Sequence, residues 1–234
     1  MSLFARWLRG APRLDEAAAR RLAAWQALDK PSPHAVLERD RFVVVDVETT
    51  GLSLATDHLI AIGAVAVKAG RIDHGDSFEI VLRQDASSGK DNILIHGIGG
   101  TAQTEGVAPA EALLRFLEYL DRDPLIAFHV AFDETMIKRA LKKTLGLNFR
   151  HIWLDLACVM PALHPELARK CRALDDWIGH FGIGNFARHS ALADSLATAQ
   201  LLQVAMESAR QNRIEDLKGL IELEKAQRWI SRTN

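Results

Sequence analysis

The stretch RFVVVDVETTG, residues 41–51, decides the predicted fold. It is an apolar, β-branched run, typical of a buried strand, and it ends at a glycine. Side chains on a strand alternate between the two faces, so Asp46 and Glu48 point one way while Val45 and Val47 point the other. The strand is therefore predicted to bring two carboxylates to one face near its end.

Two neighbouring anions on a buried strand repel each other and lose hydration. A fold keeps such a pair mainly when a cation lies between them, and oxygen-only ligands suit Mg²⁺ or Mn²⁺. The alternative is that Asp46 and Glu48 are surface residues at a strand end. Because the run around them is continuously apolar, we favour the metal site.

Composition limits the classes of protein to consider. A chain of 234 residues with 48% hydrophobic residues can bury a full core, as one domain with helical extensions. The net charge of −1 provides no global basic field, so any contact with nucleic acid must be local or run through bound metal. The two cysteines, Cys158 and Cys171, indicate reduced thiols in a cytoplasmic protein. No apolar run approaches the length of a membrane span.

Hydrophobic periodicity predicts the remaining elements. An N-terminal helix with Leu14, Ala18, Leu22, Trp25 and Leu28 on one face is expected to dock on the main domain, and a partner-binding helix is the alternative. Strands are expected at 41–49, 59–68, 72–82, 125–129 and 152–156, the second and third forming a hairpin. Helices are expected at 109–120, 132–145, 166–171, 173–180 and 191–209, followed by a C-terminal helix. Strands interleaved with helices predict an α/β fold around a mixed sheet.

Two further segments carry charged or titratable side chains where a helix begins. Asp133 falls in the first turn of the helix that follows a buried strand, where the alternative role is to satisfy free backbone N–H groups. Asp194 lies one turn into a helix that Ser190 can cap, and His189 precedes it on a loop. For His189 alone, the alternative is an ordinary surface histidine.

Together these segments resemble a known family. D-x-E-T-T-G, then H-x-A-F-D, then H-x-A-x-x-D is similar to the motif set of the DEDDh-type 3′–5′ exonucleases, the branch that contains the exonuclease domain of the DNA polymerase III epsilon (proofreading) subunit. The resemblance covers roughly residues 42–205, and three motifs in the family's order form a strong signal. It implies an RNase H-like mixed β-sheet flanked by helices.

The resemblance also implies roles at the site. Asp46, Glu48 and Asp194 would hold two divalent ions, Mg²⁺ or Mn²⁺, with Asp46 bridging them and Asp133 supporting the second through water. Two ions can serve both the attacking and the leaving oxygen of phosphodiester hydrolysis. His189 would take a proton from the attacking water, as general base.

Substrate contacts follow from the same resemblance. The implied residues are Thr49, Thr50, Gly51, Leu52, His96 and Phe132. Leu52 and Phe132 would wedge or stack against the terminal bases, but ordinary packing under the loop is an equal alternative for Leu52. The basic run after Asp133 is expected to be a solvated helix face, with phosphate tracking as the alternative.

We therefore expect a helical extension over residues 1–40, an exonuclease domain over 41–207 and a C-terminal helix over 208–234. The favoured function is metal-dependent 3′–5′ hydrolysis of single-stranded DNA ends, releasing nucleoside monophosphates. An exoribonuclease or oligonucleotide-degrading enzyme is the alternative, and a catalytically idle, polymerase-associated binding module is a third reading. Association with a DNA polymerase and the oligomeric state stay open, and no membrane contact is expected.

Overall fold

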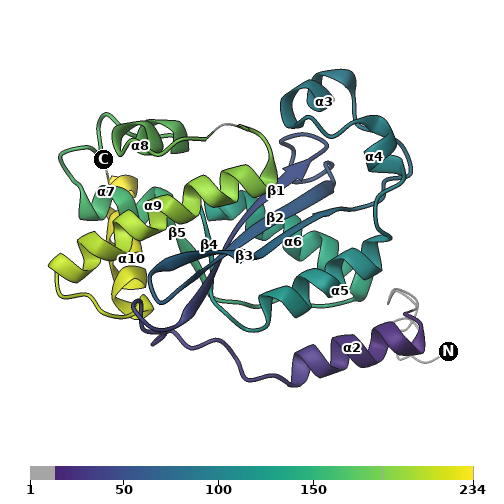
Figure 1. The fold of residues 1–234 in the computed structure, drawn as a ribbon, viewed down its shortest axis with the longest axis horizontal. Coiled ribbons are helices and arrows are strands. Elements are labelled where there is room, and N and C mark those ends of the chain that lie inside the picture. Colours follow the sequence, from purple (N-terminus) through teal and green to yellow (C-terminus); the bar gives the residue numbers. More distant parts are fainter. Residues whose placement is uncertain (1–13, 186, 234) are drawn as a thin grey trace.

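The computed structural model describes residues 14–185 and 187–233, which fold around one five-stranded sheet (Figure 1). The strands are β1 (Arg41–Thr49), β2 (Leu59–Lys68), β3 (Arg71–Val81), β4 (Leu125–Ala127) and β5 (Trp153–Asp155). Their order across the sheet is β3-β2-β1-β4-β5, which puts β1 in the centre. This position buries β1 between a neighbour on each side and helices on both faces, as its apolar run predicts.

The sheet is mixed because its two halves connect differently. β1, β2 and β3 form an antiparallel meander, and the turn between β2 and β3 places Ala69 and Gly70 at positive φ, 51° and 71°. β4 and β5 run parallel to β1, and helices cross over to reach them. The register between β1 and β2 shifts between Glu48 and Thr49, so the strand becomes irregular directly after its second carboxylate.

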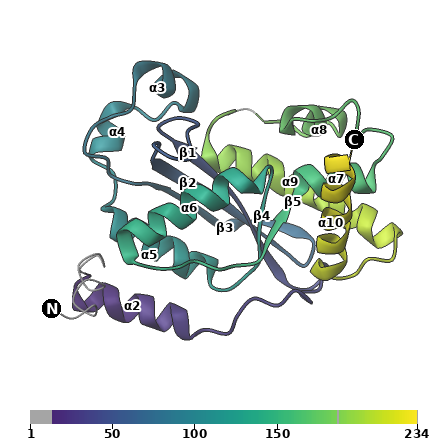
Figure 2. The same ribbon diagram turned by 180° about the vertical axis from the view of Figure 1, so that it is seen from behind.

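One face of the sheet is covered by α5 (Pro109–Leu120) and α6 (Val130–Leu145), which lie in front of the strands in Figure 2. Val43, Val45 and Val47 point into this core. The N-terminal helix α2 (Glu16–Ala27) packs on α5 and buries Leu22 and Trp25, which confirms the predicted docking face. Leu28 lies beyond the end of α2 and is exposed, so its assignment to that face was wrong.

The opposite face carries a second core. Its helices are α7 (Leu156–Leu163), α8 (Leu174–His180), α9 (Ala191–Gln211) and α10 (Leu217–Thr233). α9 crosses this face of the sheet in Figure 1 and packs on β2 and β1. Phe42 and Val44 point into this core, so Asp46 and Glu48, two and four residues further along β1, share its side of the sheet.

The predicted α/β class and mixed sheet are confirmed, while some local elements differ. The helix expected at 166–171 was wrong, because residues 165–170 form consecutive turns, and α7 forms instead directly after β5. Pro161 within α7 obscured that helix in the sequence. Two short helices, α3 (Lys90–His96) and α4 (Gly100–Thr104), form between β3 and α5, where no helix was expected. Among the described residues, none of the helices has the length and apolar character needed to cross a membrane.

Candidate active site

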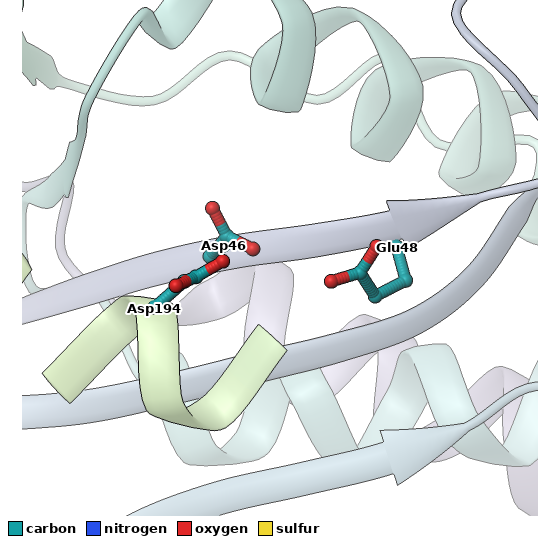
Figure 3. Close-up of side chains that lie close together, drawn as sticks. All are labelled: Asp46, Glu48 and Asp194. Carbon is teal, nitrogen blue, oxygen red and sulfur yellow. The ribbon is translucent and has the colours of Figure 1, made fainter. Parts of the chain in front are cut away.

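Three carboxylates from two distant segments meet above the end of β1. Asp46 and Glu48 come from the strand and Asp194 from the first turn of α9, and their ligand oxygens all lie within 4.8 Å of one another. Figure 3 shows the carboxylates of Asp46 and Asp194 close together, with that of Glu48 directed towards the same space. Only oxygen ligands are present in this group, which is the donor set that Mg²⁺ and Mn²⁺ prefer.

A glycine in the middle of β2 lets α9 approach closely enough to complete this group. A Cβ on Gly63 would lie 2.2 Å from the backbone of Ala191 and Leu192, so no other residue fits without moving the helix. The hydroxyl of Ser195 donates to the Gly63 carbonyl at 2.8 Å and fixes the contact. Sequence reasoning missed this residue, although a lone glycine inside a strand is a known signal of close backbone approach.

Asp133 lies at the start of α6, where it is buried. Its carboxylate accepts a backbone hydrogen bond from Val47, and desolvation by burial nevertheless raises its pKa to about 8. It is not one of the three acids within 4.8 Å, but its charge is the largest electrostatic contribution to the raised pKa of Asp46. Asp133 therefore acts electrostatically on the same site, and its role as a supporting carboxylate stays a prediction.

Burial and neighbouring charges disfavour the ionised forms of Asp46 and Glu48. Burial and the charges of Asp133, Asp194 and Glu48 hold the pKa of Asp46 well above its usual range. Burial, followed by the charge of Asp194, raises the pKa of Glu48 to about 8. A divalent cation would reverse this by stabilising the ionised forms, so the residues present fit a divalent metal site.

An arginine supplies part of the missing positive charge. Arg188 Nη1 lies 2.5 Å from Asp194 Oδ1, and Arg188 Nε lies 2.7 Å from Asp175 Oδ1. Asn185 Nδ2 also donates to Asp194 Oδ1, at 2.5 Å. Neither Arg188 nor Asn185 was singled out from the sequence, because their contact with Asp194 depends on how the loop before α9 folds. Any cation that binds Asp194 through this oxygen competes with the guanidinium.

His189 sits on the same loop, at the rim of the acid cluster. Its backbone N–H donates to Asp194 Oδ2 at 3.0 Å, and its φ is +62°. The side chain is exposed, and its ring forms no hydrogen bond with any of the residues that the structure describes. The position suits a group that reaches solvent beside the carboxylates, and the role of general base stays a prediction.

The β1–β2 loop presents the predicted substrate residues at the edge of the site. Thr50 Oγ1 and the Ser53 N–H both donate to the Asp57 carboxylate, and Thr49 Oγ1 donates to the Gly51 carbonyl. A Cβ on Gly51 would lie 2.7 Å from an oxygen of the Asp57 carboxylate, so a side chain here would displace that carboxylate from its hydrogen bonds. On this pinned loop Leu52 is 88% exposed, so the packing alternative for its side chain was wrong.

The other two residues predicted to contact substrate, His96 and Phe132, are buried and half-buried respectively. His96 is buried at the end of α3, where its Nε2 lies 2.8 Å from Asn92 Oδ1 and its Nδ1 accepts from the Ile98 N–H. Both ring nitrogens are therefore engaged within the chain. Phe132 is partly buried against the core of the α5–α6 face. Their contacts with a nucleotide stay predictions.

The metal-free site leads to a prediction about pH. Glu48 and Asp133 have a pKa near 8 in the fold, above their unfolded values, so they stabilise the folded state when protonated, and this stabilisation is lost as pH rises through 8. Burial lowers the pKa of His151 to about 4, which gives the opposite trend but only below about pH 6.5. In EDTA the free energy of unfolding is therefore expected to fall between about pH 6.5 and pH 8 and to level off above that.

Urea unfolding at several pH values would measure this fall. Added Mg²⁺ should abolish it, because a bound cation keeps the carboxylates ionised in the fold. A metal-free stability that is flat or increasing across this interval would contradict the prediction.

The fold and the acid cluster define a class, the RNase H-like nucleases. The family model described as "Exonuclease" (RNase_T) matches residues 43–202. The chain is 29% identical over 191 residues to a PolC-type DNA polymerase III of Thermotoga petrophila, and 30% identical over 167 residues to a DNA polymerase III subunit epsilon-like protein of Rhodobacter capsulatus. These matches cover 79% and 70% of this chain but only 14% and 23% of those relatives.

Solved structures agree on the fold. Escherichia coli exonuclease I in complex with a dT13 oligonucleotide superposes with a TM-score of 0.61 at 18% identity, over 74% of this chain and 42% of that one. Exonuclease X in complex with 5′ overhanging duplex DNA gives 0.56 at 18% identity, over 72% of this chain and 92% of that one. With the family model matching most of its length, this chain belongs to the RNase_T exonuclease family.

Proposed function

We propose that this protein is a divalent-metal-dependent 3′–5′ exonuclease that hydrolyses single-stranded DNA from its 3′ end and releases nucleoside monophosphates. The observation that carries the proposal is the convergence of Asp46, Glu48 and Asp194 to within 4.8 Å. Such a group is unfavourable without a cation, and phosphodiester hydrolysis is the reaction that a cation site in this fold family serves.

Bound divalent ions would supply electrostatic stabilisation of the developing charge and help to generate the nucleophile. Asp46, Glu48 and Asp194 would hold these ions, and Asp133, whose charge already acts on Asp46, would support them. His189, exposed beside Asp194, would accept the proton of the attacking water at a ring nitrogen.

The loop residues orient the substrate end in this proposal. Leu52 stands out from the loop and offers an apolar surface against which a terminal base can stack. Thr49 and Thr50 lie at the end of β1, beside Glu48, where their backbone groups can contact the terminal nucleotide.

Several wider assignments rest on the same proposal. Residues 41–207 would form the exonuclease domain, with 1–40 and 208–234 as extensions, and the family match over 43–202 supports this division. Residues 1–13 lie outside the described part of the chain. A cytoplasmic location and association with a DNA polymerase fit relatives that are named DNA polymerase III, of which this chain spans only a small part.

DNA is favoured over RNA as the substrate, because the named relatives are DNA polymerases and exonuclease I was solved with a DNA oligonucleotide. An RNA or short-oligonucleotide substrate is the alternative in the same family. A catalytically idle binding module is disfavoured, since all five proposed catalytic residues are present.

The test is a digestion panel. Single-stranded DNA, duplex DNA and RNA oligonucleotides labelled at the 5′ end would be incubated with Mg²⁺, Mn²⁺ or EDTA. We expect a ladder of 5′-labelled products that shortens from the 3′ end of single-stranded DNA, and no reaction in EDTA. Faster digestion of RNA than of DNA would identify RNA as the preferred substrate. Intact substrates under every condition would refute the nuclease proposal.

A further inference from the structure

A cleft of about 1370 Å³ lies on the α5–α6 side of the sheet and reaches the β1–β2 loop at Thr50. It is lined by the β1–β2 loop, the segment after β3, the start of α5, the second half of α6 and the segment that follows α6. Its basic lining residues are Arg83, Lys138, Arg139, Lys142, Lys143 and Arg150, against the acidic Asp57 and Asp85. In a chain with a net charge of −1, this is a marked local excess of positive charge.

Two of these six cations are already engaged. Arg139 donates to the carbonyl oxygens of Leu54, Ala55 and Asp57, and so ties α6 to the β1–β2 loop. Lys138 Nζ lies 2.5 Å from Glu134 Oε1. The three contacts of Arg139 hold the β1–β2 loop in place against α6 at the edge of the cleft.

The other four cations are available to a ligand. Arg83, Lys142, Lys143 and Arg150 are exposed, and none of them forms a salt bridge with a carboxylate in the described part of the chain. Cations that line a concave surface without acidic partners create a positive potential that attracts polyanions. The sequence suggested a solvated helix face here, but the tertiary structure adds Arg83 and Arg150 from two other segments to the lysines of α6.

The cleft reaches the active-site loop. Thr50, two residues after Glu48, lines its edge, and the exposed Leu52 is on the same loop. A strand whose terminal bases contact this loop can continue from Thr50 into the cleft. Phe149 in its lining is buried, which leaves His58 as the exposed ring beside six lysine and arginine residues, so charge dominates what the cleft offers to a ligand.

We propose that this cleft binds the phosphate backbone of the substrate strand upstream of its 3′ end, as a second, sequence-independent nucleic-acid contact. The inference rests on the proposed function for the identity of the polyanion. Contacts from lysine and arginine to phosphates release counterions, so this contact should make affinity depend on both strand length and salt. It would add affinity for long strands while leaving the chemistry at the acid cluster unchanged.

The test compares two double variants that each lose two positive charges. Lys142→Gln/Lys143→Gln removes two free cations from the cleft, and glutamine keeps the helix propensity of α6. Arg169→Gln/Lys170→Gln is the matched control, because these adjacent exposed residues lie in the turns before α8 and do not line the cleft. Binding of single-stranded DNA of about 20 nucleotides and of about four nucleotides is measured by fluorescence anisotropy in EDTA, across a salt series.

We expect the cleft variant to bind the long strand about tenfold more weakly, with the slope of log K against log salt smaller by about 0.7 for each lost contact. The control variant should match the wild type, and hydrolysis of the short strand in Mg²⁺ should be the same for all three proteins. Unchanged long-strand affinity in the cleft variant, or an equal loss in the control, would overturn the proposal. Equal competition by polyglutamate would also overturn it, by assigning the cleft to an acidic protein.

The two proposals can fail separately. Binding in EDTA does not require hydrolysis, so a charge-dependent, length-dependent affinity without any digestion in Mg²⁺ would support the cleft and refute the exonuclease. Digestion of short strands, together with an affinity that does not depend on Lys142 and Lys143, would support the exonuclease and refute the cleft.

Discussion

Replacing Asp46 by asparagine is expected to abolish nuclease activity while making the metal-free protein more stable. Ligand oxygens of Asp46, Glu48 and Asp194 lie within 4.8 Å of one another, and the charges of Asp133, Asp194 and Glu48 all raise the pKa of Asp46. Loss of one preorganised electrostatic contact typically costs about 10²–10³ in kcat. Because Asp46 is proposed to bridge two cations, its replacement should lower kcat by more than this, and we expect activity below detection.

The stability measurement separates loss of function from loss of fold. The amide of asparagine removes one charge from a group of carboxylates that repel one another, so the free energy of unfolding in EDTA at pH 8 should increase. Added Mg²⁺ should then stabilise the variant less than it stabilises the wild type. Asp29→Asn, which changes an exposed carboxylate outside this cluster, is the matched control. Retained activity in the Asp46 variant would contradict the metal-dependent mechanism.

Replacing His189 is expected to slow turnover by roughly 10²–10⁴-fold near neutral pH without weakening metal binding. Asparagine is the better replacement than alanine, because His189 has a φ of +62° and asparagine tolerates this conformation. The backbone N–H that donates to Asp194 is kept, so the variant changes only the side chain.

Three measurements define the outcome for His189. Single-turnover rates measure how far the variant is slowed. The pH profile of these rates should no longer show the titration of the general base. Titration with Mg²⁺ should give the same affinity as the wild type. His74→Ala, at an exposed histidine on β3, is the control and should behave as the wild type. A loss smaller than about tenfold would assign proton transfer to another group.

The sequence alone was sufficient for the central strand and for the three acids that the fold brings together, Asp46, Glu48 and Asp194. The run at 41–51 predicted a strand buried on both faces because it is continuously apolar and β-branched. The alternation of side chains along a strand predicted that Asp46 and Glu48 lie on one side. Helical periodicity predicted α5 with its observed bounds, and the two acid motifs at helix starts identified Asp133 and Asp194. These properties are local, so neighbouring residues encode them.

The tertiary structure decided everything that depends on contacts between distant segments. A lone glycine in a strand signals a close approach, but only the fold shows that α9 is the element that approaches Gly63. No local pattern reveals that Arg188 pairs with Asp194, or that Leu52 is exposed rather than packed. The pKa values near 8 arise from burial and from charges that only the fold brings together. The basic cleft likewise joins cations from separate parts of the chain. Charge and desolvation act through space, so their effects are fixed only when the chain is folded.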